Sequence, residues 1–97
     1  MFFPTSNGMD LNDMFYVYVL KSKKDNNLYT GFTGNLKERF KQHNAKRCLS
    51  TKQRAPFDLI YYEACLNKRD AEAREKYLKS GMGKRYIKNR LTNYFQN

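Results

Sequence analysis

Two short segments near the start of the chain have the aromatic and β-branched composition of strands. Phe15 to Leu20 is the first and Leu28 to Thr33 the second, with the polar cluster 23–27 between them. A polar cluster between two such segments predicts a tight turn, so we expect an antiparallel β-hairpin. A third strand is expected over Phe57 to Ala64, where the side chains alternate between two faces.

Three further segments have patterns typical of helices. Asn35 can cap a helix that runs from Leu36 to about Ala45. A second helix is expected from Asn67 to Ser80, ended by Gly81, and a third from Lys84 to Phe95. The order β-β-α-β-α-α predicts an α+β fold, in which helices pack on a small antiparallel sheet.

The length of 97 residues is enough for one domain. Residues 1–13 are polar and without periodicity, so we expect a disordered extension followed by a domain over residues 14–97. No segment is long enough to span a bilayer, and the N-terminus lacks the apolar run of a signal peptide. Cys48 and Cys65 form no Cys-x-x-Cys motif, which favours ordinary reduced thiols and a cytoplasmic protein.

The charge balance narrows the class of partner. Nineteen Lys and Arg against nine Asp and Glu give a net charge of +10 at pH 7. Such a charge favours polyanions, nucleic acid above all, although a basic surface that only aids solubility gives the same balance. The 46–56 loop has no acid, and we expect its four bases to contact backbone phosphates. These loop bases are Lys46, Arg47, Lys52 and Arg54.

One carboxylate departs from the apolar patterning of its helix. Glu75 lies on the same helical stripe as Ala71 and Leu78, where an unpaired carboxylate would be costly to bury. Three explanations are open: a buried salt bridge to one of the many bases, a role as metal ligand or acid–base group, or a helical phase that differs from the assumed one.

Two polar residues share the inward face of the first predicted helix. Arg39 and His43 follow Leu36 by three and seven positions. A guanidinium suits phosphate because it donates two parallel hydrogen bonds and keeps its charge, although a lone Arg is more often ion-paired. His43 is a candidate base or phosphate donor, but a surface histidine at a helix end is the commoner case.

The hairpin carries three tyrosines that are either packing groups or reactive ones. Tyr16 and Tyr18 point to one side of their strand, and Tyr29 has Gly31 beside it on its own face. Hairpin tyrosines usually pack with their hydroxyls in water. A phenol acts as a general base only when its surroundings lower its pKa from about 10.

These residues together resemble a known family. Tyr16-Val17-Tyr18 and, after ten intervening residues, Tyr29-Thr30-Gly31 resemble the paired triplets of the GIY-YIG nuclease superfamily. Residues 35–44 resemble its arginine helix. Residues 56–63 and 71–81 resemble its stand-alone bacterial branch, whose members are similar to the N-terminal nuclease domain of a bacterial excision-repair protein.

The resemblance implies a fold, an activity and a set of site residues. The fold would be a three-stranded antiparallel sheet flanked by helices. The activity would be that of a metal-dependent endonuclease acting on DNA rather than RNA, in repair or recombination, without a small-molecule cofactor. Tyr18, with its pKa lowered by cations, would take a proton from the attacking water, and Tyr29 would position that group. Arg39 would stabilise the charge on phosphate, Glu75 would hold a single Mg²⁺ or Mn²⁺, and His43 would lie near the water.

The sequence also departs from the family pattern. Tyr16 replaces the first Gly, Thr30 replaces the Ile of the second triplet, and Asn89 is the candidate for an asparagine found in longer members. Two other functions therefore stay open: a non-catalytic module that binds nucleic acid, and a structural partner in a ribonucleoprotein. A focused site favours the enzyme, whereas a diffuse basic coat favours the scaffold.

Overall fold

The computed structural model describes residues 13–96 and contains one three-stranded sheet with four helices. The predicted extension lies, apart from Asp13, outside the described residues. The elements are β1 (Phe15–Ser22), β2 (Leu28–Thr33), α1 (Leu36–Asn44), β3 (Phe57–Cys65), α2 (Lys68–Lys79), α3 (Gly81–Arg90) and α4 (Thr92–Gln96). All three strands are antiparallel, in the order β2-β1-β3, so the predicted α+β fold is confirmed.

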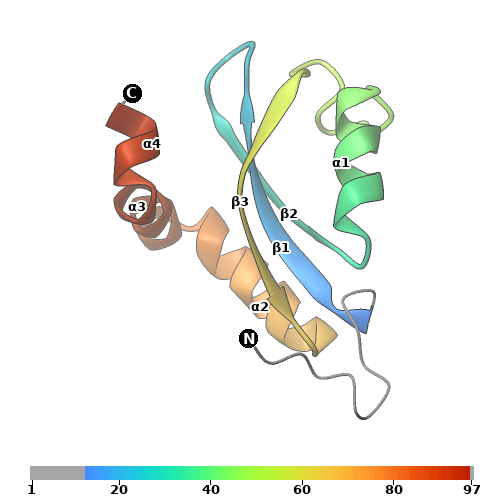
Figure 1. The fold of residues 1–97 in the computed structure, drawn as a ribbon, viewed down its shortest axis with the longest axis vertical. Coiled ribbons are helices and arrows are strands. Elements are labelled where there is room, and N and C mark those ends of the chain that lie inside the picture. The colour runs from blue at the N-terminus through green and yellow to red at the C-terminus, as the bar shows by residue number, and fades with distance from the viewer. Residues whose placement is uncertain (1–12, 97) are drawn as a thin grey trace.

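Helices cover the two faces of the sheet separately, with α1 on one side and α2 and α3 on the other (Figure 1). Because β1 is the central strand, its alternate side chains enter two different cores. Val17 and Val19 pack with Leu78 and Ile87 beneath α2 and α3. Tyr18 belongs to the core on the α1 face, where Leu36 and Phe40 also pack.

The register fixes what lies beside Tyr18. On β2 its partner is Gly31, and on β3 its partner is Tyr62. The pairing of β1 with β3 shifts between Val19 and Leu20, which is a bulge or similar irregularity. Tyr18 therefore sits in the middle of the sheet with a residue that lacks a side chain on one flank.

The expected third helix is wrong in its bounds, because α3 already begins at Gly81 and a separate α4 follows Leu91. Ser80 is extended, with φ −75° and ψ 168°, and its hydroxyl accepts a hydrogen bond from the Gly83 N–H. It therefore caps α3 immediately after α2 ends. A Cβ on Gly83 would collide with the Tyr77 carbonyl, so this glycine allows the close approach of the two helices.

No helix in the described part of the chain, residues 13–96, is long and apolar enough to cross a membrane.

Candidate active site

His43 lies fully buried between α1 and the sheet, so the commoner case of a surface histidine is wrong here. Its Nε2 is 2.8 Å from the Tyr18 hydroxyl oxygen, and its Nδ1 is 2.8 Å from the Oγ1 of Thr51. The helical phase turns this position toward the sheet. A buried imidazole needs a partner at each nitrogen, and the strand and the loop supply one each.

The protonation state of His43 follows from its surroundings. Burial, and secondarily the positive charge of Arg39, lower the pKa of His43 to about 4. The ring is therefore neutral at pH 7, with one nitrogen that donates and one that accepts. When Tyr18 donates to Nε2, the Nδ1–H donates to Thr51.

Tyr18 is 1% exposed, and burial raises the pKa of its hydroxyl to about 12. Hydrogen bonding from Arg39 opposes this increase but is the smaller effect. The expected lowering of the pKa of Tyr18 by nearby cations is therefore wrong, since desolvation outweighs the cation. The phenol keeps its proton at neutral pH and can take up another only by passing its own to His43.

Gly31 determines where the Tyr18 ring lies. A Cβ built on Gly31 would stand 2.6 Å from the Tyr18 hydroxyl oxygen and 2.8 Å from Cζ. Gly34, in the turn before α1, has no comparable contact, since its nearest neighbour would be the Phe15 ring at 4.0 Å. The glycine of the second triplet thus leaves room for the tyrosine of the first.

Tyr29 and Arg39 complete the cluster on the α1 face. The Tyr29 ring centroid lies 5.2 Å from that of His43 and 6.5 Å from that of Tyr18. Arg39 is partly exposed, and its Nη1 donates to the Oε1 of Gln42 at 3.2 Å. Hydrogen bonding with Tyr18 raises the pKa of Arg39 further. Four of the five expected reactive residues are therefore close together.

Glu75, the fifth residue, lies on α2 and so on the opposite face of the sheet (Figure 1). Its helical phase is the expected one, because Ala71 and Leu78 on the same stripe are buried. Its carboxylate pairs with Lys79 at 3.2 Å, and the two side chains are 20% and 55% exposed. The buried salt bridge considered for Glu75 is thus a half-exposed pair within one helix, worth about 0.3–0.5 kcal/mol.

A cavity of about 200 Å³ lies at the edge of β2, between this strand and the helices α2 and α3. Tyr29 lines the cavity, and so does Lys79, the partner of Glu75. Within residues 13–96 no group of three or more His, Cys, Asp or Glu side chains could enclose a metal. One accessible carboxylate oxygen nevertheless fits Mg²⁺, which keeps several waters and is often held by one or two carboxylates plus substrate phosphates.

The four bases of the 46–56 loop differ in their surroundings. Arg54 donates to Asp25 at 2.8 Å and lies over the Phe57 ring, 5.7 Å from its centroid. The hydrogen bonds from Arg54 lower the pKa of Asp25 to about 2. Arg54 therefore ties the loop to the β1–β2 turn, a structural role that sequence reasoning missed. The other three bases, called here the exposed loop bases, are Lys46, Arg47 and Lys52.

One further expectation concerns Asn89, and one residue of the site, Thr51, was not expected. Asn89 is exposed on α3, the helix that packs on the α2 side of the sheet. Thr51, in contrast, was missed, although it is fully buried and hydrogen-bonded to His43. No local pattern marks it, because a single hydroxyl in a basic loop is ordinary. Its role depends on how the loop folds back over α1.

Comparisons with known proteins agree with the geometry. A profile described as the GIY-YIG catalytic domain matches residues 14–86. A UPF0213 protein of Clostridium perfringens is 50% identical over 68 residues, which cover 68% of this chain and 71% of the relative. Another, of Pediococcus acidilactici, is 38% identical over 92 residues, covering 89% and 87%.

A solved structure shows the same fold. The solution NMR structure of a UPF0213 protein from Bacillus halodurans is 31% identical and matches with a TM-score of 0.52. The match covers 80% of this chain and 85% of the other. The resemblance noted in the triplets and the arginine helix is thereby confirmed. This chain belongs to the GIY-YIG catalytic domain family, and its relatives are small UPF0213 proteins.

Proposed function

We propose that this protein is a divalent-metal-dependent nuclease that hydrolyses phosphodiester bonds of DNA. The observation that carries the proposal is the hydrogen-bonded chain from Tyr18 through His43 to Thr51, with Arg39 beside the phenol. Burying polar groups lowers the stability of a small domain unless the groups are paired. A fully buried series of hydrogen-bonded side chains that leads to a partly exposed cation therefore indicates a functional site. The net charge of +10 suits a polyanionic substrate.

Arg39 binds the phosphate in this proposal. Its guanidinium is partly exposed next to Tyr18 and can donate to two phosphate oxygens at once. The positive charge of Arg39 is also one of the two causes that hold the pKa of His43 low. A bound phosphate offsets that charge, so substrate binding makes the imidazole more basic when it has to accept a proton.

The proton of the attacking water is then accepted by the hydrogen-bonded side chains of Tyr18 and His43. Tyr18 is buried and held by Arg39, so the water reaches the phenol oxygen only once Arg39 has turned to the phosphate. The water oxygen then forms a bond to phosphorus while the water gives its proton to the Tyr18 oxygen. The phenol passes its own proton to Nε2 of His43, and the Nδ1–H of the resulting imidazolium donates to Thr51. The phosphorus–oxygen bond to the leaving group breaks, and that oxygen is protonated from solvent. Tyr29 flanks both rings and orients the water.

Glu75 would hold the Mg²⁺ or Mn²⁺ on α2, one helical turn before Lys79, which lines the cavity at the edge of β2 together with Tyr29. When bound, the ion supplies positive charge against the phosphate and the leaving oxygen. For this, the Glu75 carboxylate has to exchange its Lys79 partner for the cation. The half-exposed pair makes that exchange inexpensive.

A second candidate function is a nucleic-acid-binding module without cleavage. It is favoured by the position of Glu75 on the other face of the sheet, where its carboxylate is already paired with Lys79. Such a module keeps the fold and the basic surface. It yields no product that depends on a divalent metal.

The experiment that tests the proposed function offers a panel of labelled flaps, junctions, duplexes and single strands. Wild type, Arg39→Lys and Lys41→Ala are incubated with Mg²⁺, with Mn²⁺ and with a chelator. Lys41, exposed on the same helix, is the matched control. We expect metal-dependent products from wild type and Lys41→Ala and a loss of about 10²–10³-fold in Arg39→Lys, which keeps the charge but loses the planar fork. Tight binding without product on every substrate would favour the binding module.

A further inference from the structure

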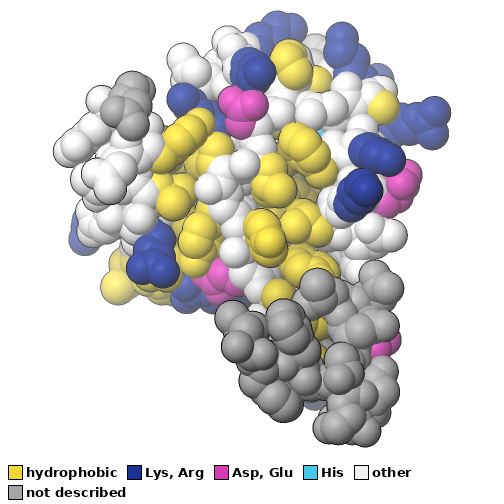
Figure 2. All heavy atoms as spheres, viewed as in Figure 1, with side chains coloured by type: hydrophobic (Ala, Val, Ile, Leu, Met, Phe, Trp, Pro, Cys, Tyr) yellow, Lys and Arg dark blue, Asp and Glu magenta, His cyan; other side chains and the backbone are white. Residues whose placement is uncertain are grey.

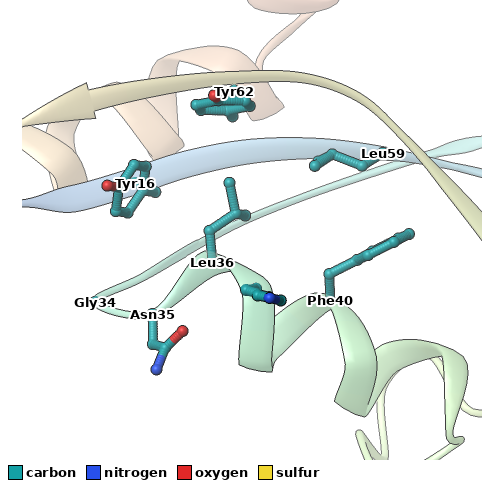
Figure 3. A pocket seen from close by; sticks show the side chains of 8 residues that line it. Tyr16, Gly34, Asn35, Leu36, Phe40, Leu59 and Tyr62 are labelled. Carbon is teal, nitrogen blue, oxygen red and sulfur yellow. The ribbon is translucent and has the colours of Figure 1, made fainter. Parts of the chain in front are cut away.

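A second cavity of about 550 Å³ lies on the same face of the sheet as the Tyr18 cluster. It is formed between the first turns of α1 and the strands β1 and β3, and Figure 3 shows Leu36 and Phe40 pointing from the helix toward it. The cavity is also lined by Tyr16, Tyr62, Leu59 and Lys37. This volume is within the range of small-molecule sites.

The aromatic wall that Tyr62 forms is open to a ligand. Tyr62 is 54% exposed, and its ring meets that of Tyr16 edge-on, with centroids 6.0 Å apart and an interplanar angle of 61°. The edge-on contact and the exposure of Tyr62 leave a face of the Tyr62 ring available for a flat molecule. Figure 2 shows apolar side chains gathered over the centre of the visible face, with lysine and arginine around them.

The cavity adjoins the proposed site of hydrolysis. Tyr62 is the β3 partner of Tyr18, and Tyr16 precedes Tyr18 by two residues on the same face of β1. Leu36 and Phe40 line the cavity and also pack against the core that contains Tyr18. Arg39 lines a separate hollow on the β2 side of α1, and Asn35, just before α1, lines both that hollow and this cavity. A strand whose phosphate lies at Arg39 therefore reaches the two tyrosines by crossing the start of α1.

We propose that this cavity receives an unpaired nucleobase of the substrate strand, which stacks on Tyr62. Lys37 binds the phosphate next to that base. The net charge of +10 and the exposed Lys37 in the lining favour a nucleic acid over an apolar peptide as occupant. Stacking tolerates every base, because each has a π-face. A paired base inside a duplex cannot enter, so the preferred substrates carry unpaired nucleotides.

This inference rests on the proposed nuclease function, but binding tests it without cleavage. The dissociation constants of wild type, Tyr62→Ala, Tyr62→Phe and Tyr94→Ala are measured in chelator for a single strand and for a duplex of equal length. Tyr94, 39% exposed on α4, is the control for loss of a surface tyrosine. The single strand carries 2-aminopurine, whose fluorescence falls when it stacks on an aromatic ring.

The expected results separate stacking from general attraction. Loss of one stacking partner should weaken binding of the single strand by Tyr62→Ala by roughly 5- to 160-fold. Tyr62→Phe and Tyr94→Ala should bind like wild type, duplex binding should not change, and quenching should disappear in Tyr62→Ala alone. Unchanged single-strand affinity in Tyr62→Ala would overturn the inference, and so would an equal loss on both substrates.

Three other outcomes also decide whether the cavity binds a base. If Tyr62→Ala fails to fold, wild-type protein that binds the single strand without quenching 2-aminopurine overturns the inference by itself. A wild type that quenches the fluorophore but cuts nothing would support the base pocket and contradict the proposed hydrolysis. Efficient binding of an apolar peptide in competition with the single strand would assign the cavity to a protein partner instead.

Discussion

Lowering the pH from 7 to 5 should reduce the free energy of unfolding of this protein by about 2 kcal/mol, because of His43. The pKa of this side chain is about 4 in the folded protein, against 6.5 for an ordinary histidine. Below pH 6.5 the unfolded chain binds a proton that the folded chain refuses, so stability is lost as the pH falls toward 4. Evaluating the two titrations at pH 7 and pH 5 gives the difference of about 2 kcal/mol.

The window from pH 7 to pH 5 isolates this group. The carboxylates with lowered pKa values have ordinary values of 3.8 for Asp25 and 4.5 for Glu63, so their contributions are lost only at lower pH. The neighbours of the His43 ring do not titrate here, because Arg39 remains charged and the pKa of Tyr18 is raised to about 12. His43 is also the sole histidine in the sequence.

The assay is thermal unfolding followed by circular dichroism at several pH values. For a domain of this size, about 2 kcal/mol corresponds to a fall in Tm of about 8–16 °C between pH 7 and pH 5. His43→Gln, which cannot be protonated, should lose most of this dependence although it starts from a lower Tm. Parallel pH profiles for wild type and His43→Gln would refute the burial of a neutral imidazole, and so would a constant wild-type Tm.

Three further outcomes follow from the contacts. Gly31→Ala should displace the Tyr18 ring and lower stability by about 1–3 kcal/mol, whereas Gly34→Ala should change the Tm little; equal Tm values for both would contradict the steric argument. Replacing the three exposed loop bases with Ala should flatten the slope of log affinity against log salt by about 3 × 0.9 on duplex DNA, and an unchanged slope removes the loop from the interface. Glu75→Gln should abolish metal-dependent cleavage while changing stability by less than about 0.5 kcal/mol, and cleavage that persists would exclude Glu75 as the ligand.

Local patterns were sufficient for much of the fold. The bounds predicted for β2 are those observed, because a β-branched and aromatic segment between polar turns has little alternative. Helical phase also correctly placed Arg39 and His43 on the inward face of α1. It failed at Ser80, where one residue ends a helix and caps the next, which depends on the contact between Gly83 and α2.

The site needed long-range information that the sequence does not carry. Helical phase shows that Glu75 faces the sheet, but it does not show which of the two faces of the sheet α2 covers. The face that α2 covers separates Glu75 from the tyrosines. The direction of the pKa shift of Tyr18 depended on its central strand and on α1 covering it. No sequence pattern identifies Thr51, because it is the fold of the loop that places it beside His43, eight residues earlier in the sequence.

The most direct test of the central claim is the single-turnover rate of DNA cleavage by Tyr18→Phe in the presence of Mg²⁺ or Mn²⁺. The substitution keeps the ring over Gly31 but removes the oxygen that is hydrogen-bonded to His43 and that, in the proposed mechanism, accepts the proton of the water. At a temperature well below both Tm values, we expect the rate to fall by about 10²–10⁴-fold relative to wild type, with binding retained. A Tyr18→Phe variant that cuts as fast as wild type would contradict the account, because the proton would then leave by another path.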